Sequence, residues 1–243
     1  MAALRLVGAP PHPTQQQVHT MSRLLYFTPA FLLLGMGFLF APIMMLDAPS
    51  LASSQVWALW TGHFLHWTPG HFFWDWALFL FCLWMLADSG WRVWGWVLAA
   101  LPVLSLVIFL WRPDMWEYRG LSGIDTVLFT RIAVGFFQDR LNPRGVRWLG
   151  GLALVGLLGK IIWEFSSGGA FFSGDLGPGN TPLPEIHVAG VVIGLIWALW
   201  ERVRRKVSWA GNSDPLCLEE AAQSNGDLHG GREAALSVAI RRA

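Results

Sequence analysis

Six stretches of mostly apolar residues alternate with shorter polar segments along this chain of 243 residues. They cover residues 24–46, 71–87, 91–111, 120–137, 148–165 and 185–201. A helix needs roughly 20 apolar residues to cross the hydrocarbon core of a bilayer, and each stretch comes close to that length. The fourth and sixth are shorter and richer in glycine and polar residues. The pattern predicts an all-α membrane protein, a bundle of six transmembrane helices.

Lysine and arginine positions orient the predicted bundle, because cytoplasmic loops are enriched in both. The loop at residues 140–147 holds three arginines, and residues 202–206 hold four basic side chains. Residues 47–70 and 166–184 hold none. Both termini are therefore expected in the cytoplasm. The predicted organisation is a cytoplasmic N-terminal segment, a membrane domain and a flexible cytoplasmic tail, at residues 1–23, 24–202 and 203–243.

Composition agrees with this class of protein. Charged residues make up 14% of the chain, whereas soluble domains usually carry about 25%. The net charge of +1 leaves no basic surface for nucleic acid, and none is expected as a partner. The two cysteines, Cys82 and Cys217, are too few for a disulfide framework.

Polar residues inside the predicted helices indicate function, because lipid cannot solvate them. They form three groups. His63, His66, His71 and Asp75 precede or open the second helix, Gly120, Ser122, Gly123 and Asp125 open the fourth, and Glu185, His187, Gly190 and Gly194 open the sixth. These three helices all run inward from the outer side. The three groups are therefore expected to lie at one depth, near the extracytoplasmic ends.

Ser122 and His187 are the candidate catalytic pair. A serine hydroxyl is a weak nucleophile until a base such as histidine takes its proton. Ser122 opens a helix, so its backbone N–H can face a developing oxyanion, with His71 and Asp75 as further candidate donors. Gly190 and Gly194 form a GxxxG pattern, which lets two helices approach closely.

Several of these residues also have structural interpretations. Serine between Gly120 and Gly123 is common where membrane helices pack. The loop histidines suggest a metal or haem site, although their spacing is not that of a helical ligand pair. Lys160 and Glu164 are four residues apart in the fifth helix and are expected to neutralise each other. A role for this pair in substrate binding or gating is the alternative.

Together the three groups resemble the motifs of rhomboid intramembrane serine proteases. That family has His-x-x-x-Asn in its second helix, Gly-x-Ser-Gly opening its fourth and His-x-x-Gly-x-x-x-Gly in its sixth. This chain has His71-Phe-Phe-Trp-Asp75, Gly120-Leu-Ser122-Gly123 and His187-Val-Ala-Gly190-Val-Val-Ile-Gly194. The resemblance covers residues from about 24 to 202. It implies a Ser122–His187 dyad, an oxyanion site at His71, Asp75 and the Ser122 backbone, structural roles for His66 and the glycines, and no cofactor or metal.

Within that family the chain looks most like the rhombosortases. The shared wording includes Thr61-Gly62-His63-Phe64-Leu65-His66, the segment from Tyr118 to Gly123, and Lys160-x-x-x-Glu164. This resemblance implies an enzyme that removes C-terminal Gly-Gly sorting anchors from exported bacterial proteins. It also implies a Gram-negative inner membrane with the site facing the periplasm, and substrates that are transmembrane segments within the bilayer.

Two positions depart from the rhomboid pattern. Asp75 stands where the family usually has Asn, and an ionised carboxylate cannot donate to an oxyanion. A neutral Asp75 could donate, or Asp75 could pair with His71 and leave His71 as the main donor. Thr126 stands where the family often has an aromatic residue or His packed on the base. These departures favour an alternative function, a catalytically impaired rhomboid-like protein that binds membrane clients.

Overall fold

The computed structural model describes residues 15–113, 117–171, 176–177 and 180–211, with side chains described between residues 24 and 205. Most of the predicted tail, residues 212–243, lies outside the described residues, as do residues 1–14. The chain up to Ala198 forms one compact unit, and a second begins at Leu199. In this second unit the Arg204 guanidinium lies 4.6 Å from the centre of the Trp200 ring, a cation–π contact.

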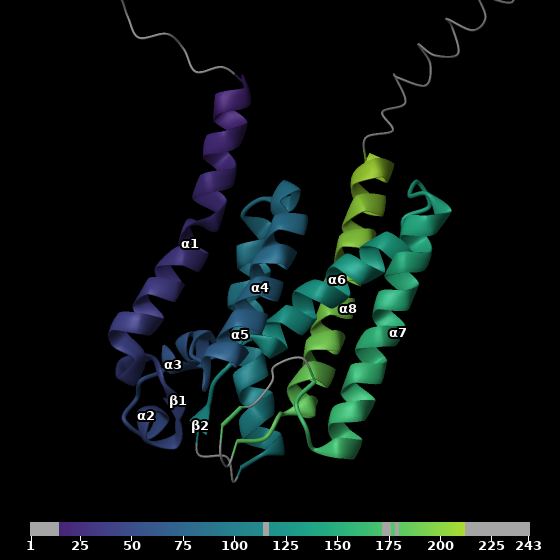
Figure 1. Ribbon diagram of the computed structural model, residues 1–243. Helices are drawn as coiled ribbons and strands as arrows, with labels where there is room; N and C mark the ends of the chain where they lie inside the picture. Colours follow the sequence, from purple (N-terminus) through teal and green to yellow (C-terminus); the bar gives the residue numbers. More distant parts are fainter. Residues whose placement is uncertain (1–14, 114–116, 172–175, 178–179, 212–243) are drawn as a thin grey trace, which may run out of the picture. The chain divides into compact units, whose positions relative to one another are not determined.

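A long helix covers all or most of each predicted apolar stretch (Figure 1). These helices are α1 (Gln15–Met44), α4 (Pro69–Met85), α5 (Arg92–Trp111), α6 (Ser122–Gln138), α7 (Arg144–Ser167) and α8 (Pro184–Gly211). The described chain is therefore mostly helical, as the sequence predicts. Helix α8 continues to Gly211, so the first residues of the predicted flexible tail are helical.

The loop between α1 and α4 is folded rather than extended. It holds β1 (Leu46–Asp47), α2 (Ala48–Ala52), α3 (Ala58–Thr61) and the 3₁₀ helix η1 (Gly62–Phe64). Strand β1 pairs antiparallel with β2 (Glu117–Tyr118), with Leu46 opposite Tyr118. Gly62 permits this arrangement, because a Cβ there would lie 2.3 Å from the Leu46 Cβ. The β1–β2 pair fixes the segment that leads into α6.

Four helices are long and apolar enough to cross a membrane: Leu24–Met44, Arg92–Trp111, Arg144–Ser167 and Pro184–Arg205. The windows in α1 and α7 are each only 11% buried, so their apolar side chains point outward. Such surfaces suit lipid rather than water. Helices α4 and α6 have 17 residues each and are not among the four. The structure is consistent with an all-α membrane protein.

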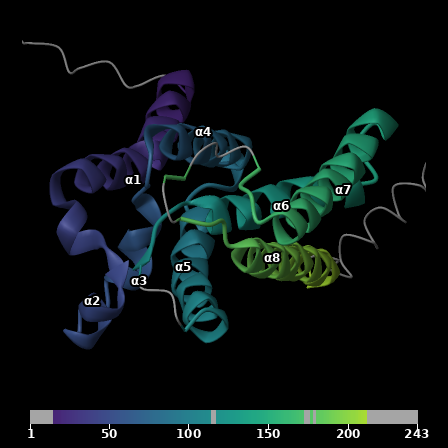
Figure 2. The ribbon, with the colours of Figure 1, turned by 60° about the horizontal axis from the view of Figure 1, so that its bottom comes forward.

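Helix α6 is the most buried of the long helices and lies at the centre of the first unit. Ile124, Val127 and Leu128 of α6 are fully excluded from the surface, as is Leu121 just before the helix, and they share one core cluster with Leu104 of α5. Helix α7 lies beside α6 in both views (Figures 1 and 2). A central helix that opens with Ser122 places this residue inside the protein, where neighbouring helices can reach it.

Candidate active site

Ser122 is the first residue of α6, and the backbone conformation of Gly120 directs the chain into this helix. Gly120 has φ +132°, a conformation that L side chains rarely adopt. A Cβ at Gly120 would also lie 2.9 Å from His71 Nε2. The first helical hydrogen bond of α6 runs from Asp125 N–H to Leu121 C=O at 2.9 Å. Glycine is therefore required at 120 for both its backbone conformation and its close contact with α4.

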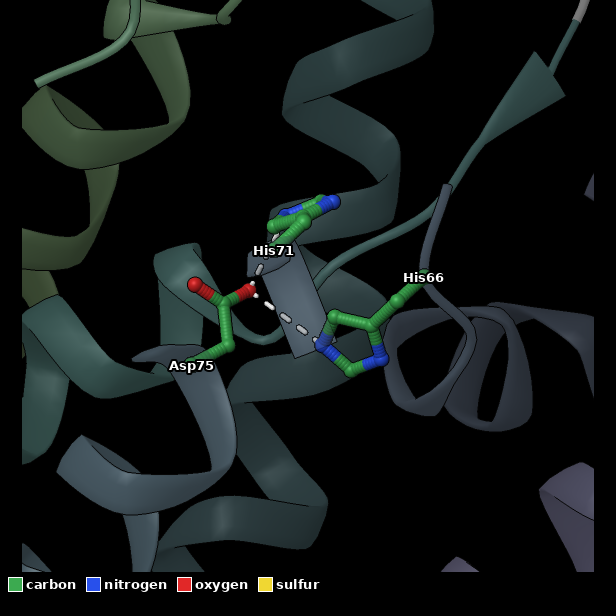
Figure 3. Close-up of side chains that lie close together, drawn as sticks. All are labelled: His66, His71 and Asp75. Carbon is green, nitrogen blue, oxygen red and sulfur yellow. Dashed lines mark ion pairs between the residues drawn. The ribbon is translucent and has the colours of Figure 1, made fainter. Parts of the chain in front are cut away.

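His71 and Asp75 lie on α4, at a position set by the start of that helix. Thr68 caps α4, its Oγ1 accepting the His71 N–H at 3.2 Å, and Pro69 occupies the first turn. His71 and Asp75 then face the same side, with His71 Nε2 3.2 Å from Asp75 Oδ2. The same oxygen lies 3.4 Å from His66 Nε2, so the three side chains converge on one point (Figure 3).

Asp75 also contacts the segment that carries Ser122. Its Oδ2 accepts a hydrogen bond from the Leu121 backbone N–H at 2.9 Å, and the carboxyl is buried. An oxygen surrounded by one amide donor and two imidazole nitrogens acts as an acceptor. The structure therefore favours the pairing of Asp75 with His71 over direct donation by Asp75.

The cluster of His66, His71 and Asp75 has the composition of a metal site, since one ligand atom from each lies within 4.8 Å of the others. The sequence spacing of the histidines had argued against such a site, but the folded loop brings His66 onto α4. Burial lowers the pKa of His66, which Asp75 partly offsets. Among the described residues, His66 Nε2 has only this ion-pair contact with Asp75, and its Nδ1 forms no hydrogen bond.

The glycines of α8 bring His187 to α6. A Cβ at Gly190 would lie 2.7 Å from the Gly123 carbonyl oxygen, and one at Gly194 would lie 2.7 Å from the Val127 carbonyl oxygen. A Cβ at Gly123 would in turn meet the Ile186 side chain at 2.8 Å. The predicted close packing of the GxxxG face is confirmed, and α6 is the helix it packs against.

Ser122 and His187 line one cavity of about 680 Å³, together with residues of α4 and α7. The other polar side chains around it are Asp75, Asp125, Thr126 and Lys160. Apolar side chains supply most of the remaining wall, including Trp74 and Phe81 of α4. Ser122 is half-buried, whereas His187 is buried. The cavity thus joins a hydroxyl, an imidazole and a largely apolar volume.

The structure records no hydrogen bond between Ser122 and His187, both of which are described. The Ser122 hydroxyl and the Gly123 backbone instead lie close enough to the Tyr118 phenol to lower its pKa, though by less than burial raises it. Tyr118 is fully buried, and its hydroxyl donates to the Gly120 carbonyl at 2.9 Å. Burial raises the pKa of Tyr118 well above its usual range, so the phenol stays neutral. Sequence reasoning missed this residue, although Tyr118 is part of the motif around Ser122.

His187 faces the charged pair on α7. Its Nδ1 lies 2.7 Å from Glu164 Oε2, and Lys160 Nζ lies 2.7 Å from Glu164 Oε1. Lys160 and Glu164 therefore pair as predicted, but Glu164 also contacts the candidate base. One sequence signal for this contact was topological: α7 runs opposite to α8, so its end lies at the depth of the start of α8.

Asp125 and Thr126 complete the wall one turn after Ser122. The Thr126 hydroxyl donates to the Ser122 carbonyl at 2.7 Å, and its side chain packs where Gly190 leaves room. Asp125 is 2% exposed, and neither carboxyl oxygen has a hydrogen-bond partner among the described residues. No hydrogen bond or ion pair joins either residue to His187 in the described part of the chain. The sequence matches no protein-family model and no curated protein.

Proposed function

We propose that this chain is an intramembrane serine endopeptidase of the rhomboid type, with Ser122 as nucleophile and His187 as base. The observation that carries the proposal is the shared cavity, which both side chains line from helices packed in backbone contact. A histidine beside a serine in an apolar cavity matches the requirements of nucleophilic catalysis. The close packing of α8 on α6 holds the two groups in one place.

In the proposed reaction Ser122 Oγ bonds to the carbonyl carbon of a peptide while its proton passes to His187. The peptide C–N bond then breaks, and His187 returns the proton to the leaving amine. Water attacks the resulting ester with His187 again as base, which releases the acid and restores Ser122. The chemistry requires no metal and no cofactor.

The oxyanion site combines His71 with the backbone N–H of Ser122. Asp75 contacts His71 and accepts the N–H of Leu121, the residue before Ser122. In this proposal Asp75 therefore positions both donors rather than donating itself. Donors fixed before the reaction stabilise the developing charge without reorganisation.

The proposed bundle has six spans with both termini in the cytoplasm, α4 and α6 adding to the four longer helices. At 1.5 Å per residue, 17 residues extend roughly 26 Å, slightly less than the hydrocarbon core. Ser122 would then lie below the extracytoplasmic surface. The site would face the periplasm of a bacterial inner membrane, in keeping with the basic loops on the opposite side.

The proposed substrates are transmembrane segments, in particular C-terminal sorting anchors with a Gly-Gly motif. The cavity supports access from the bilayer, because its wall includes Trp74 and Phe81, which are about half exposed on α4, and Leu157 of α7. An apolar segment arriving between α4 and α7 would reach Ser122 without leaving lipid. The second candidate function is a client-binding protein without activity. Two observations favour it: Asp75 stands in place of Asn, and the structure records no hydrogen bond between Ser122 and His187.

Fluorophosphonate labelling of the detergent-solubilised full chain distinguishes the two functions. We expect labelling of the wild type that is lost in Ser122→Ala and in His187→Ala. Phe81→Ala, which removes cavity wall but no reacting group, should retain labelling. If the folded wild type is not labelled at any pH from about 5 to 9, the range over which histidine titrates, the client-binding function is favoured.

A further inference from the structure

The contacts of His187 with α7 define the state of its imidazole ring. Nδ1 lies 2.7 Å from Glu164 Oε2, and both side chains are almost fully buried. The ring N–H direction is not aligned with Oε2, so the contact is an ion pair rather than a formed hydrogen bond. A carboxylate this close still favours a proton on Nδ1 over a lone pair there. With the carboxylate ionised this proton belongs to Nδ1. The neutral imidazole then has its free lone pair on Nε2, the nitrogen that can act as base.

Lys160 supports the ionised state of Glu164. Its Nζ lies 2.7 Å from Oε1, and the backbone N–H of Phe171 donates to the same oxygen at 3.2 Å. Glu164 therefore has two donors at Oε1, while Oε2 faces the His187 ring without a hydrogen bond among the described residues. A buried carboxylate needs such partners, and a proton on Nδ1 supplies the charge complement at Oε2. Lys160 Nζ also lies 3.2 Å from His187 Nδ1 and 3.4 Å from His187 Nε2. The ammonium thus lies beside both ring nitrogens, whereas the structure records no hydrogen bond from Ser122 to either.

We propose that Glu164 is a positioning residue for His187, so that the catalytic unit is Ser122–His187–Glu164 with Lys160 as the counter-ion. The inference rests on the function proposed above. Glu164 fixes the Nδ1–H form of the ring and stabilises the imidazolium that forms when Ser122 loses its proton. The Lys160 ammonium balances the charge of the Glu164 carboxylate. It must move away from His187 before the Ser122 hydroxyl can donate to Nε2.

This assignment explains a departure of the sequence from the rhomboid pattern. Thr126 stands where an aromatic residue or His would pack on the base, and it bonds back to its own helix instead. The ring of His187 therefore needs another support, and α7 supplies it. A charged pair inside a membrane helix is costly, and here it contacts His187, whose imidazole lines the cavity.

Glu164→Gln is the decisive variant, because glutamine keeps the size and an acceptor for Lys160 and Phe171. Its amide can present N–H groups to Nδ1, which favours the ring form with the proton on Nε2. We expect the rate of fluorophosphonate labelling to fall by roughly 10²- to 10⁴-fold. Glu164→Asp, which keeps the carboxylate, should retain more activity than the glutamine variant.

The pH profile separates positioning from mere support of the fold. Among the described residues, the charged groups that share the cavity or contact His187 are Asp75 on α4, Asp125 on α6, and Lys160 and Glu164 on α7. Glu185 lies two residues before His187 on α8. In Glu164→Gln the Lys160 ammonium remains beside the ring without the carboxylate, and this disfavours a protonated imidazole. The decline of the labelling rate on the acid side should therefore occur at lower pH. Lys160→Met leaves the carboxylate alone, so that decline should occur at higher pH.

Asp139→Asn is the matched control, since Asp139 is exposed at the end of α6 and its amide can still accept the Leu141 N–H. Its labelling rate and pH profile should equal those of the wild type. Equal labelling of Glu164→Gln and wild type, or shifts of both α7 variants in the same direction, would overturn the inference. Absence of labelling in the wild type would instead reject the proposed function. Melting temperatures of all variants identify any that fail to fold.

Discussion

Asp75 Oδ2 accepts the backbone N–H of Leu121 at 2.9 Å, which joins α4 to the residue immediately before the candidate nucleophile. The contact lies beside Gly120, whose positive φ turns the chain into α6. The first turn of α6 thus depends on a side chain 46 residues away in sequence. An oxygen acceptor at position 75 is consequently a structural requirement, whether or not the residue takes part in catalysis.

Replacement of Asp75 should reveal this requirement. Asp75→Leu leaves the buried Leu121 N–H without an acceptor, which costs about 1–3 kcal/mol, and its melting temperature should fall. Asp75→Asn keeps an acceptor for the Leu121 N–H and adds an N–H₂ donor. This variant should fold normally, and fluorophosphonate should label it faster than the wild type. Thermal unfolding in detergent and labelling rates measure the two effects. Equal melting temperatures for the leucine variant and the wild type would contradict the structural role.

The close packing of α8 on α6 gives a second prediction. Gly190→Ala places a Cβ about 2.7 Å from the Gly123 carbonyl oxygen, so the helices must separate, at a cost of about 1–3 kcal/mol. We expect a lower melting temperature and slower labelling, because His187 moves with α8. Gly159→Ala on α7 is the matched control. A Cβ there meets nothing within 4 Å, and alanine favours the helix by up to about 1 kcal/mol.

Tyr118→Phe tests the role of the buried phenol near Ser122. The variant removes the donor to the Gly120 carbonyl and the phenol oxygen that lies near the Ser122 hydroxyl. The lost bond to a buried carbonyl should lower stability by about 1 kcal/mol. Release of the Ser122 hydroxyl toward the cavity should meanwhile increase the labelling rate. A variant that is both less stable and slower to label would mean that Tyr118 aligns Ser122 instead of restraining it.

Hydrophobic length predicted the positions of the helices well, because apolar stretches of this size have few alternatives to helix in lipid. It could not predict the structure of residues 47–68, where Gly62 packs on Leu46 and short helices replace a loop. Nor did it predict the helical start of the tail up to Gly211. These features depend on contacts between distant segments, which periodicity does not report.

At the candidate site, the sequence predicted which helix ends would meet but not which atoms. The Gly190 and Gly194 contacts with α6 follow directly from the GxxxG pattern. The contact of Glu164 with His187 did not, since the i,i+4 pairing with Lys160 already accounted for Glu164. The cluster of His66 with Asp75 was likewise hidden, because its separation in sequence differs from that of helical ligand pairs.

Chelation tests whether the cluster of His66, His71 and Asp75 holds a metal. Asp75 Oδ2 already receives the Leu121 N–H and lies near both imidazoles, so we expect these contacts to suffice. Labelling and melting temperature should be unchanged by 1,10-phenanthroline. Zinc present at one equivalent in the purified protein, and lost in His66→Ala, would contradict this expectation and favour a metalloprotein.

His63 gives a pH dependence of stability outside the catalytic groups. It is fully buried, and the Ser105 hydroxyl, which donates to the Leu59 carbonyl, lies 2.8 Å from His63 Nε2. That hydroxyl proton is already used, so Nε2 carries the donor and the ring is neutral. Burial lowers the pKa of His63 from 6.5 to about 4, and backbone contacts offset only part of this change.

The sign of the effect follows from this lowered pKa. Between about pH 6.5 and 4 the unfolded chain binds a proton at His63 that the folded chain does not, so stability falls as pH falls through this window. The full difference corresponds to about 3 kcal/mol. His63→Gln keeps an N–H donor for Ser105 but cannot titrate, so its melting temperature should change less over this range than that of the wild type. Because the carboxyl groups that titrate near pH 4 are the same in both proteins, only the difference between their curves reports on His63. Parallel curves would show that His63 is accessible to protons in the folded protein, contrary to its burial behind Tyr118 and α5.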